Sequence, residues 1–159
     1  MDMGKYSVFI VVNERLRIGR NELPYASDYS FWIPLISRYL AASDTIRIDC
    51  WIDEEYAINR VLPYARQVDQ ESNPYMKIFW LDKTPEVIDD IILNPFDDEP
   101  KIAWFSIFLE KDGVVFFSSS HYGLELSASD VDEVEVEFLR KSVTPDMYIH
   151  VWDSAGRNC

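Results

Sequence analysis

The sequence predicts a single α/β or α+β domain built on a mixed β-sheet of about six strands, with three to four helices. Short runs of β-branched and aromatic residues alternate with segments whose apolar residues recur at helical spacing. A chain of 159 residues, 48% of them hydrophobic, is long enough for a substantial core. No internal repeat or low-complexity linker divides it. We therefore expect one globular domain over residues 1–153 and a frayed tail over 154–159.

The first third of the chain predicts two strands and a helix. The run 6–13 (YSVFIVVN) contains no breaker and predicts a buried strand. After a polar, arginine-bearing connection, apolar spacing predicts a helix over 28–42, which tolerates Pro34 only near its first turn. Strict alternation over 45–51 predicts a second strand with one partly solvated face.

The next segment repeats this order. Asp53 opens a second predicted helix, and the run 75–81 (YMKIFWL) predicts a third strand. Thr84 as N-cap, followed by Pro85 at the first helical position, is the clearest helix start in the chain. We expect that helix to end near Leu93.

The last third predicts a hairpin, an ambiguous segment and a final strand. The apolar run 102–110 and a Lys-Asp-Gly turn predict a hairpin with 114–119. Over 127–143 the alternation of Val and Glu fits a strand, whereas an apolar stripe with Ser129 as cap fits a helix, which we favour. The run 146–153 predicts the final strand. Strand-to-helix alternation predicts parallel neighbours, and the hairpin makes the sheet mixed.

The charge of the chain is strongly acidic and unevenly distributed. Asp and Glu number 28 against 15 Lys and Arg, which gives a formal net charge of -13 and argues against a nucleic-acid-binding protein. Residues 1–50 contain six acids and six bases, so the whole excess lies in 51–159. Each acidic cluster alone is typical of a solvated surface.

Other features of the sequence indicate the compartment. No apolar stretch approaches the roughly 18 residues of a membrane span, and no cleavage pattern follows the first apolar run. Cys50 and Cys159 are the only cysteines and make a poor disulfide framework. We therefore expect a cytoplasmic protein that contacts no membrane.

Acidic residues and two tryptophans follow the predicted strands. If the first four strands are parallel, their carboxyl ends share one edge of the sheet, where α/β proteins commonly bind ligands. This predicted acidic rim would bind a cationic protein surface and comprises Glu14, Trp51, Asp53, Glu54, Glu55, Trp80, Asp82, Glu110 and Asp112. The loop of Asp97, Asp98 and Glu99 would fall at the opposite edge and is the alternative contact site. Helix capping and core burial would explain the same residues without a partner.

Catalytic motifs are absent from the sequence. His121 stands beside three serines, 118–120, without a GxSxG context, while His150 and Cys50 alternate within predicted strands. The histidines and cysteines have no zinc-site spacing, the acids have no EF-hand spacing, and five glycines form neither a P-loop nor a dinucleotide motif. We therefore expect no catalytic residue, no metal and no cofactor, and a protein that is not an enzyme.

In size, charge and lack of catalytic motifs, the chain resembles the immunity proteins of bacterial polymorphic toxin and contact-dependent inhibition systems. These small acidic proteins bind and neutralise a cognate toxin, often a nuclease with a cationic active site. The resemblance implies an inhibitor that covers a basic site, and it assigns no functional residue. Two alternatives stay open: a metal-dependent hydrolase that uses carboxylate clusters with His121 as base, and a homo-oligomeric structural subunit with aromatic residues at its self-interface.

Overall fold

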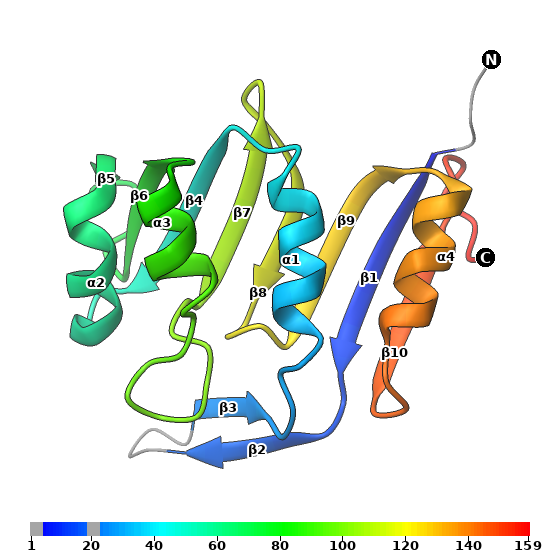
Figure 1. Ribbon diagram of the computed structural model, residues 1–159, viewed down its shortest axis with the longest axis horizontal. Helices are drawn as coiled ribbons and strands as arrows, with labels where there is room; N and C mark the ends of the chain where they lie inside the picture. The colour runs from blue at the N-terminus through cyan, green and yellow to red at the C-terminus, as the bar shows by residue number, and fades with distance from the viewer. Residues whose placement is uncertain (1–4, 19–22) are drawn as a thin grey trace.

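The main element of the computed structural model is an eight-stranded sheet (Figure 1). The structure describes residues 5–18 and 23–159, so two parts of the predicted domain, 1–4 and 19–22, lie outside the described residues. The strands of the sheet are β1 (Tyr6–Val12), β4 (Thr45–Trp51), β5 (Ala65–Asp69), β6 (Met76–Asp82), β7 (Ser106–Lys111), β8 (Val114–Ser120), β9 (Glu125–Val131) and β10 (Met147–Trp152). A separate hairpin pairs β2 (Arg15–Ile18) with β3 (Leu23–Ala26).

The strand order is β10-β1-β9-β8-β7-β4-β6-β5. Between the described residues, every strand pairing in this sheet is antiparallel. The domain is therefore of the α+β class, one of the two classes that the sequence predicts. Its sheet has eight strands, whereas about six were predicted.

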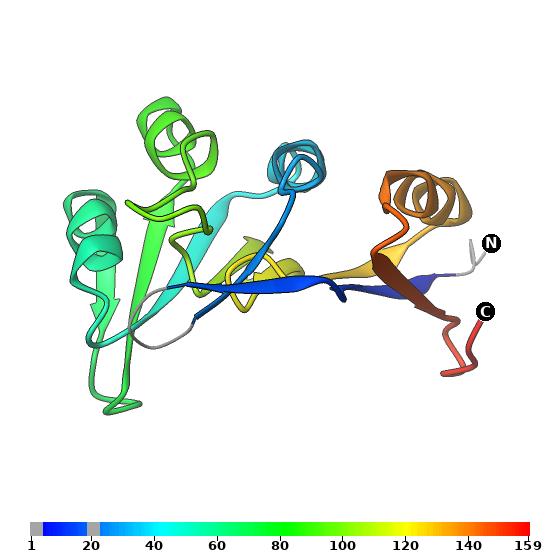
Figure 2. The same ribbon diagram turned by 90° about the horizontal axis from the view of Figure 1, so that it is seen from below.

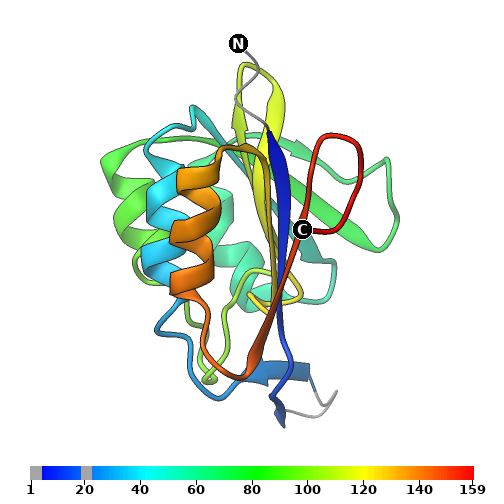
Figure 3. The same cartoon turned by 90° about the vertical axis from the view of Figure 1, so that its right-hand side faces the viewer.

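The helices lie together on one face of the sheet, and the other face carries none of them (Figures 2 and 3). They are α1 (Trp32–Leu40), α2 (Glu55–Val61) with the 3-10 turn η1 (Leu62–Tyr64), α3 (Pro85–Val87) with the π-helical turn η2 (Ile88–Ile92), and α4 (Glu133–Ser142). Within the described part of the chain, no helix combines the length and apolarity needed to cross a membrane.

The core lies between the sheet and this helical layer. On β4 the side chains of Ile46, Ile48 and Cys50 are fully buried, each removing apolar area from water. The buried tryptophans satisfy their polar atoms, because Trp32 Nε1 donates to Ser119 Oγ at 2.9 Å and Trp104 Nε1 donates to a backbone carbonyl at 2.9 Å.

Most predicted elements are present. Five predicted strands correspond to β1, β4, β6, β8 and β10 within one or two residues, and Pro34 is the third residue of α1, in its first turn. The Thr84 cap is confirmed, since Thr84 Oγ1 accepts a hydrogen bond from the Val87 N–H at 3.2 Å. The strand predicted over 102–110 begins only at Ser106.

The ambiguous segment 127–143 is divided between a strand and a helix. β9 extends to Val131, and Asp130 in it has a φ of 58° beside a shift of register against β1. The helix begins at Glu133, and its cap is Asp132, whose Oδ1 accepts from the Glu135 N–H at 2.8 Å. Ser129, the predicted cap, lies within β9.

The predicted parallel arrangement of the first four strands is wrong. β5 is inserted between α2 and β6, so β6 returns antiparallel to β4. Pairing places Trp51 opposite Met76 and Thr45 opposite both Asp82 and Glu110. The ends of β6 and β7 therefore lie about 20 Å from the end of β4, at roughly 3.3 Å per residue.

The last residues, expected to be frayed, fold back beside β10. Trp152 forms a bridge with Asn158, and the Cys159 N–H donates to the Val151 carbonyl at 2.6 Å. Arg140 of α4 donates to the Cys159 carbonyl at 3.1 Å.

Candidate functional site

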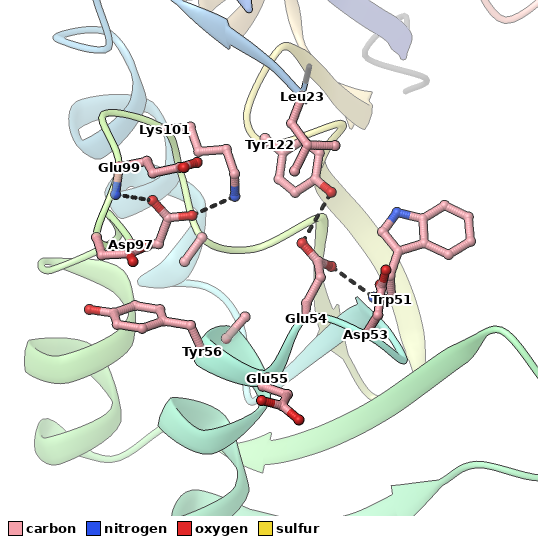
Figure 4. A pocket seen from close by; sticks show the side chains of 13 residues that line it. Leu23, Trp51, Asp53, Glu54, Glu55, Tyr56, Asp97, Glu99, Lys101 and Tyr122 are labelled. Atoms are coloured by element: carbon pink, nitrogen blue, oxygen red, sulfur yellow. Dashed lines mark hydrogen bonds and ion pairs between the residues drawn. The ribbon is translucent and has the colours of Figure 1, made fainter. Parts of the chain in front are cut away.

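A cavity of about 560 Å³ opens at the end of the sheet where β4 terminates (Figure 4). Three segments form most of its walls: the turn from β4 into α2, the loop 97–101, and the turn between β8 and β9. Leu23 of β3 and Ala103 also line it. Its lining residues are Leu23, Trp51, Asp53, Glu54, Glu55, Tyr56, Ala57, Asp97, Asp98, Glu99, Lys101, Ala103 and Tyr122. We call it the acidic cavity, because six carboxylates and a single ammonium line it.

The acidic cavity unites the two contact sites that the sequence placed at opposite edges. Trp51 and the residues 53–55 of the predicted rim form one wall, and Asp97, Asp98 and Glu99 form the facing wall. The prediction that the loop 97–99 lies at the other edge of the sheet is therefore wrong. Tyr56, Lys101 and Tyr122 complete the cavity and were missed by the sequence analysis.

The other predicted rim residues do not reach the acidic cavity. Asp82, Glu110 and Asp112 lie at the far end of the sheet, where the Asp82 carboxylate pairs with Arg66 at 2.5 Å. Glu14 follows β1, which the strand order separates from β4 by three strands.

Trp80 lies on the face of the sheet that carries no helix. The Arg47 guanidinium is 4.8 Å from the Phe108 ring centroid and 5.8 Å from that of Trp80. The same guanidinium binds both oxygens of Asp49, at 2.8 and 2.9 Å. Trp80 therefore belongs to a local aromatic and ionic cluster rather than to the rim.

Glu54 is the innermost carboxylate of the β4–α2 wall. Its Oε1 accepts the Trp51 N–H at 2.8 Å, and its Oε2 accepts the Tyr122 hydroxyl at 3.1 Å. Burial raises the pKa of Glu54, although these two hydrogen bonds and the nearby Lys101 oppose the rise. The Glu54 side chain is thus held by two hydrogen bonds, and burial makes its ionised form less favourable than it would be in water.

Replacing Glu54 with glutamine is expected to flatten the pH dependence of stability above about pH 4.3, the unfolded-state pKa of glutamate. A carboxyl whose pKa is raised by folding favours the folded state when protonated, and this contribution is lost as the pH rises through the folded-state pKa. The amide can keep both hydrogen bonds, because its oxygen accepts from Trp51 and its nitrogen can donate to Tyr122. Urea unfolding between about pH 4 and 7 measures this; parallel profiles for the wild type and E54Q contradict it, and E55Q at the exposed neighbour is the control.

Lys101 is a buried cation within the loop wall. Only 3% of the residue is exposed, and its Nζ lies 2.5 Å from Asp97 Oδ2 and 4.3 Å from the Tyr122 ring centroid. Asp97 also accepts the Glu99 N–H at 2.7 Å. Asp97 neutralises the positive charge of Lys101 in this ion pair. The remaining carboxylates of the cavity have no further cation among the lining residues to balance them.

The turn between β8 and β9 holds Tyr122 in place. Three successive residues, His121, Tyr122 and Gly123, have φ angles of 52°, 60° and 80°. Such left-handed conformations cost energy in non-glycine residues and persist only where the surroundings enforce them. The Tyr122 carbonyl accepts the Tyr29 hydroxyl at 2.7 Å, and burial raises the pKa of Tyr122. The glycine after Tyr122 is the sequence feature that could have located this turn.

Arg60 of α2 fixes the loop wall. Its guanidinium donates to the carbonyls of Phe96 at 2.8 Å and Asn94 at 2.5 Å, and also to that of Asp90. The same group lies 4.8 Å from the Trp104 ring centroid. The charge of Arg60 is therefore directed to the backbone of the 90–96 segment and does not line the cavity.

The two histidines lie apart from one another. His121 Nδ1 is 2.8 Å from Glu125 Oε2, and His150 stacks on Trp152 with ring centroids 5.8 Å apart. Within residues 5–18 and 23–159, no group of three or more His, Cys, Asp or Glu side chains is arranged to hold a metal ion.

The fold and the site define an α+β domain with an acidic, aromatic-rimmed cavity at one end of its sheet. No known family, curated protein or solved structure matches the chain.

Proposed function

We propose that the chain is an acidic protein-binding module that inhibits a cationic partner, in the manner of an immunity protein that covers the basic active site of a toxin. The observation that carries this proposal is the union of both acidic segments in one cavity with aromatic side chains at its mouth. Trp51 is 37% exposed and Tyr56 48% exposed beside these carboxylates. Trp and Tyr are among the residues that contribute most of the binding energy in protein interfaces. Charges complementary to those of the partner add specificity and speed association.

The partner's basic side chains would enter the acidic cavity, and the aromatic rings would contact their apolar stems. Trp51 is supported for this role by the Phe105 ring, whose centroid lies 4.9 Å away. The net charge of -13 would accelerate encounter with a basic surface through long-range attraction.

Reversing two charges at the mouth of the acidic cavity is expected to weaken binding by about tenfold or more at low salt, mainly through the association rate. The variant is Asp53→Lys with Asp98→Lys, because both side chains are exposed at the cavity. The measurement is surface plasmon resonance against a basic toxin domain encoded in the neighbouring gene, at several salt concentrations.

The matched control is Asp89→Lys with Glu137→Lys, which changes net charge equally at exposed positions outside the cavity. If both double variants lose affinity equally, net charge alone acts and the acidic cavity is not the contact site. Binding that does not respond to salt or to the cavity variant contradicts the proposal.

A further inference from the structure

A second pocket adjoins the acidic cavity across the loop 95–102. It has a volume of about 350 Å³, and its walls are mainly apolar or aromatic: Tyr29, Trp32, Ile33, Pro95, Phe96 and Ile102. We call it the Phe96 pocket. Phe96 is 40% exposed, and its ring meets that of Tyr29 edge-on with centroids 5.7 Å apart.

The loop 95–102 is a shared wall of both pockets. Pro95, Phe96 and Ile102 line the Phe96 pocket, whereas 97–99 and Lys101 line the acidic cavity. Backbone pairing between Phe96 and Ile102 and a hydrogen bond from the Ala103 N–H to the Pro95 carbonyl, at 2.7 Å, close the loop at its base. Together with the Asp97–Lys101 ion pair, these bonds hold the two pockets in a fixed relation.

The two pockets are also linked beneath the loop. The Tyr29 hydroxyl donates to the carbonyl of Tyr122, and the Tyr122 hydroxyl donates to Glu54. One aromatic side chain of the Phe96 pocket is thus bonded to a residue that lines the acidic cavity. These hydrogen bonds beneath the loop connect the walls of the two pockets.

We infer that the Phe96 pocket receives an apolar side chain of the same cationic partner, on a segment that crosses the loop 95–102 and places a basic side chain in the acidic cavity. The inference rests on the proposed function. The negative charge of the acidic cavity favours a cationic segment. Because the loop 95–102 lines both pockets, a segment bound in the cavity that crosses this loop reaches the Phe96 pocket. A cavity of this size suits one side chain, and burying an apolar group there adds affinity that charge alone does not supply.

The test uses defined peptides as probes. One series is acetyl-Arg-(Gly)n-Phe-amide with short glycine spacers, and its partner series has Ala in place of Phe. Amide chemical-shift titration of the wild-type protein at low salt gives the dissociation constants. At the best spacer, the Phe peptide is expected to bind about tenfold more tightly, with shifts at Ser30 and Phe96 that the Ala peptide does not cause.

Variants assign the difference to the pocket. Phe96→Ala and, separately, Ile33→Ala are expected to reduce the preference for Phe over Ala, while Tyr148→Ala, an exposed aromatic on the far edge strand β10, keeps it. The Asp53→Lys, Asp98→Lys variant should weaken both peptides to a similar extent.

The outcomes separate the two claims. If both peptides bind the wild type equally and both are weakened by charge reversal, the Phe96 pocket is not used and the proposed function stands. If neither peptide binds, or if charge reversal has no effect on either, the proposed function fails as well. A preference for Phe that survives both Phe96→Ala and Ile33→Ala also overturns the inference.

Discussion

Replacing Gly123 with alanine is expected to lower the free energy of unfolding by about 2–5 kcal/mol. The φ of 80° costs an L-residue roughly 1–2 kcal/mol, and overpacking a core adds roughly 1–3 kcal/mol. A Cβ at this position would lie 3.0 Å from Trp32 Cδ1 and 3.1 Å from Ile102 Cγ1. The Trp32 ring cannot move aside freely, because its Nε1–H donates a hydrogen bond to the buried Ser119 hydroxyl.

Gly113 provides the matched control. Its φ is also 80°, but a Cβ there would have no neighbour within 4 Å. Gly113→Ala should therefore cost about 1–2 kcal/mol, the conformational penalty alone. Urea unfolding of both variants measures the difference, and equal losses would show that packing around Gly123 contributes nothing.

The same variant tests how the acidic cavity is built. Gly123 follows Tyr122 directly, and a backbone that leaves the left-handed region would move the hydroxyl that binds Glu54. We expect G123A to alter the amide shifts of Trp51 and Glu54 as well as the stability. Strain at this turn is thus the cost of presenting Tyr122 to the cavity.

The sequence was most informative where local chemistry determines structure. Alternation located β4, and the Thr84 cap with Pro85 located α3, because these signals act within a few residues. β5 (ARQVD) was missed since it is a short edge strand with little apolar content. β9 was missed because Asp130, in a left-handed conformation, interrupts its alternation.

The omission of β5 explains the wrong strand directions. Without β5, helix α2 reads as a crossover between parallel strands, whereas β5 reverses the chain before β6. β6 and β7 do run in the same direction, but both pair with β4, which lies between them. The chain from β6 through α3 to β7 is thus a helical crossover between parallel strands, and the antiparallel strand β4 lies between them. The alternation of strands and helices in the sequence does not reveal that β4 is inserted there.

The acidic residues of the candidate site were identifiable, but their assembly was not. Composition and position singled out Asp53 and Glu54 on one side and the loop 97–99 on the other. Their meeting depends on Arg60, which binds carbonyls more than 30 residues away, and on Tyr122, which binds Glu54 across 68 residues. Contacts of this separation leave no local pattern, so the sequence assigned the two acidic segments to opposite edges.

Removal of the Lys101 ammonium should have a large effect on stability. Replacing Lys101 with methionine is expected to cost about 3–5 kcal/mol, since Asp97 would remain as a buried carboxylate without its cation. The side chains of Lys101 and Asp97 are only 4% and 10% exposed. Such a loss is a large part of the roughly 5–15 kcal/mol that stabilises a typical domain.

The second variant, Lys101→Met with Asp97→Asn, should recover most of this loss. Asparagine keeps an acceptor for the Glu99 N–H, and methionine can pack against the Tyr122 ring that the lysine covers. Asp97→Asn alone leaves a buried ammonium and should be destabilised like Lys101→Met. Unfolding free energies of the four proteins form a double-mutant cycle, in which we expect a coupling at least as large as either single loss, about 3 kcal/mol or more. Additive losses would mean that the two side chains stabilise the loop independently and that the ion pair is not what holds the wall of the acidic cavity.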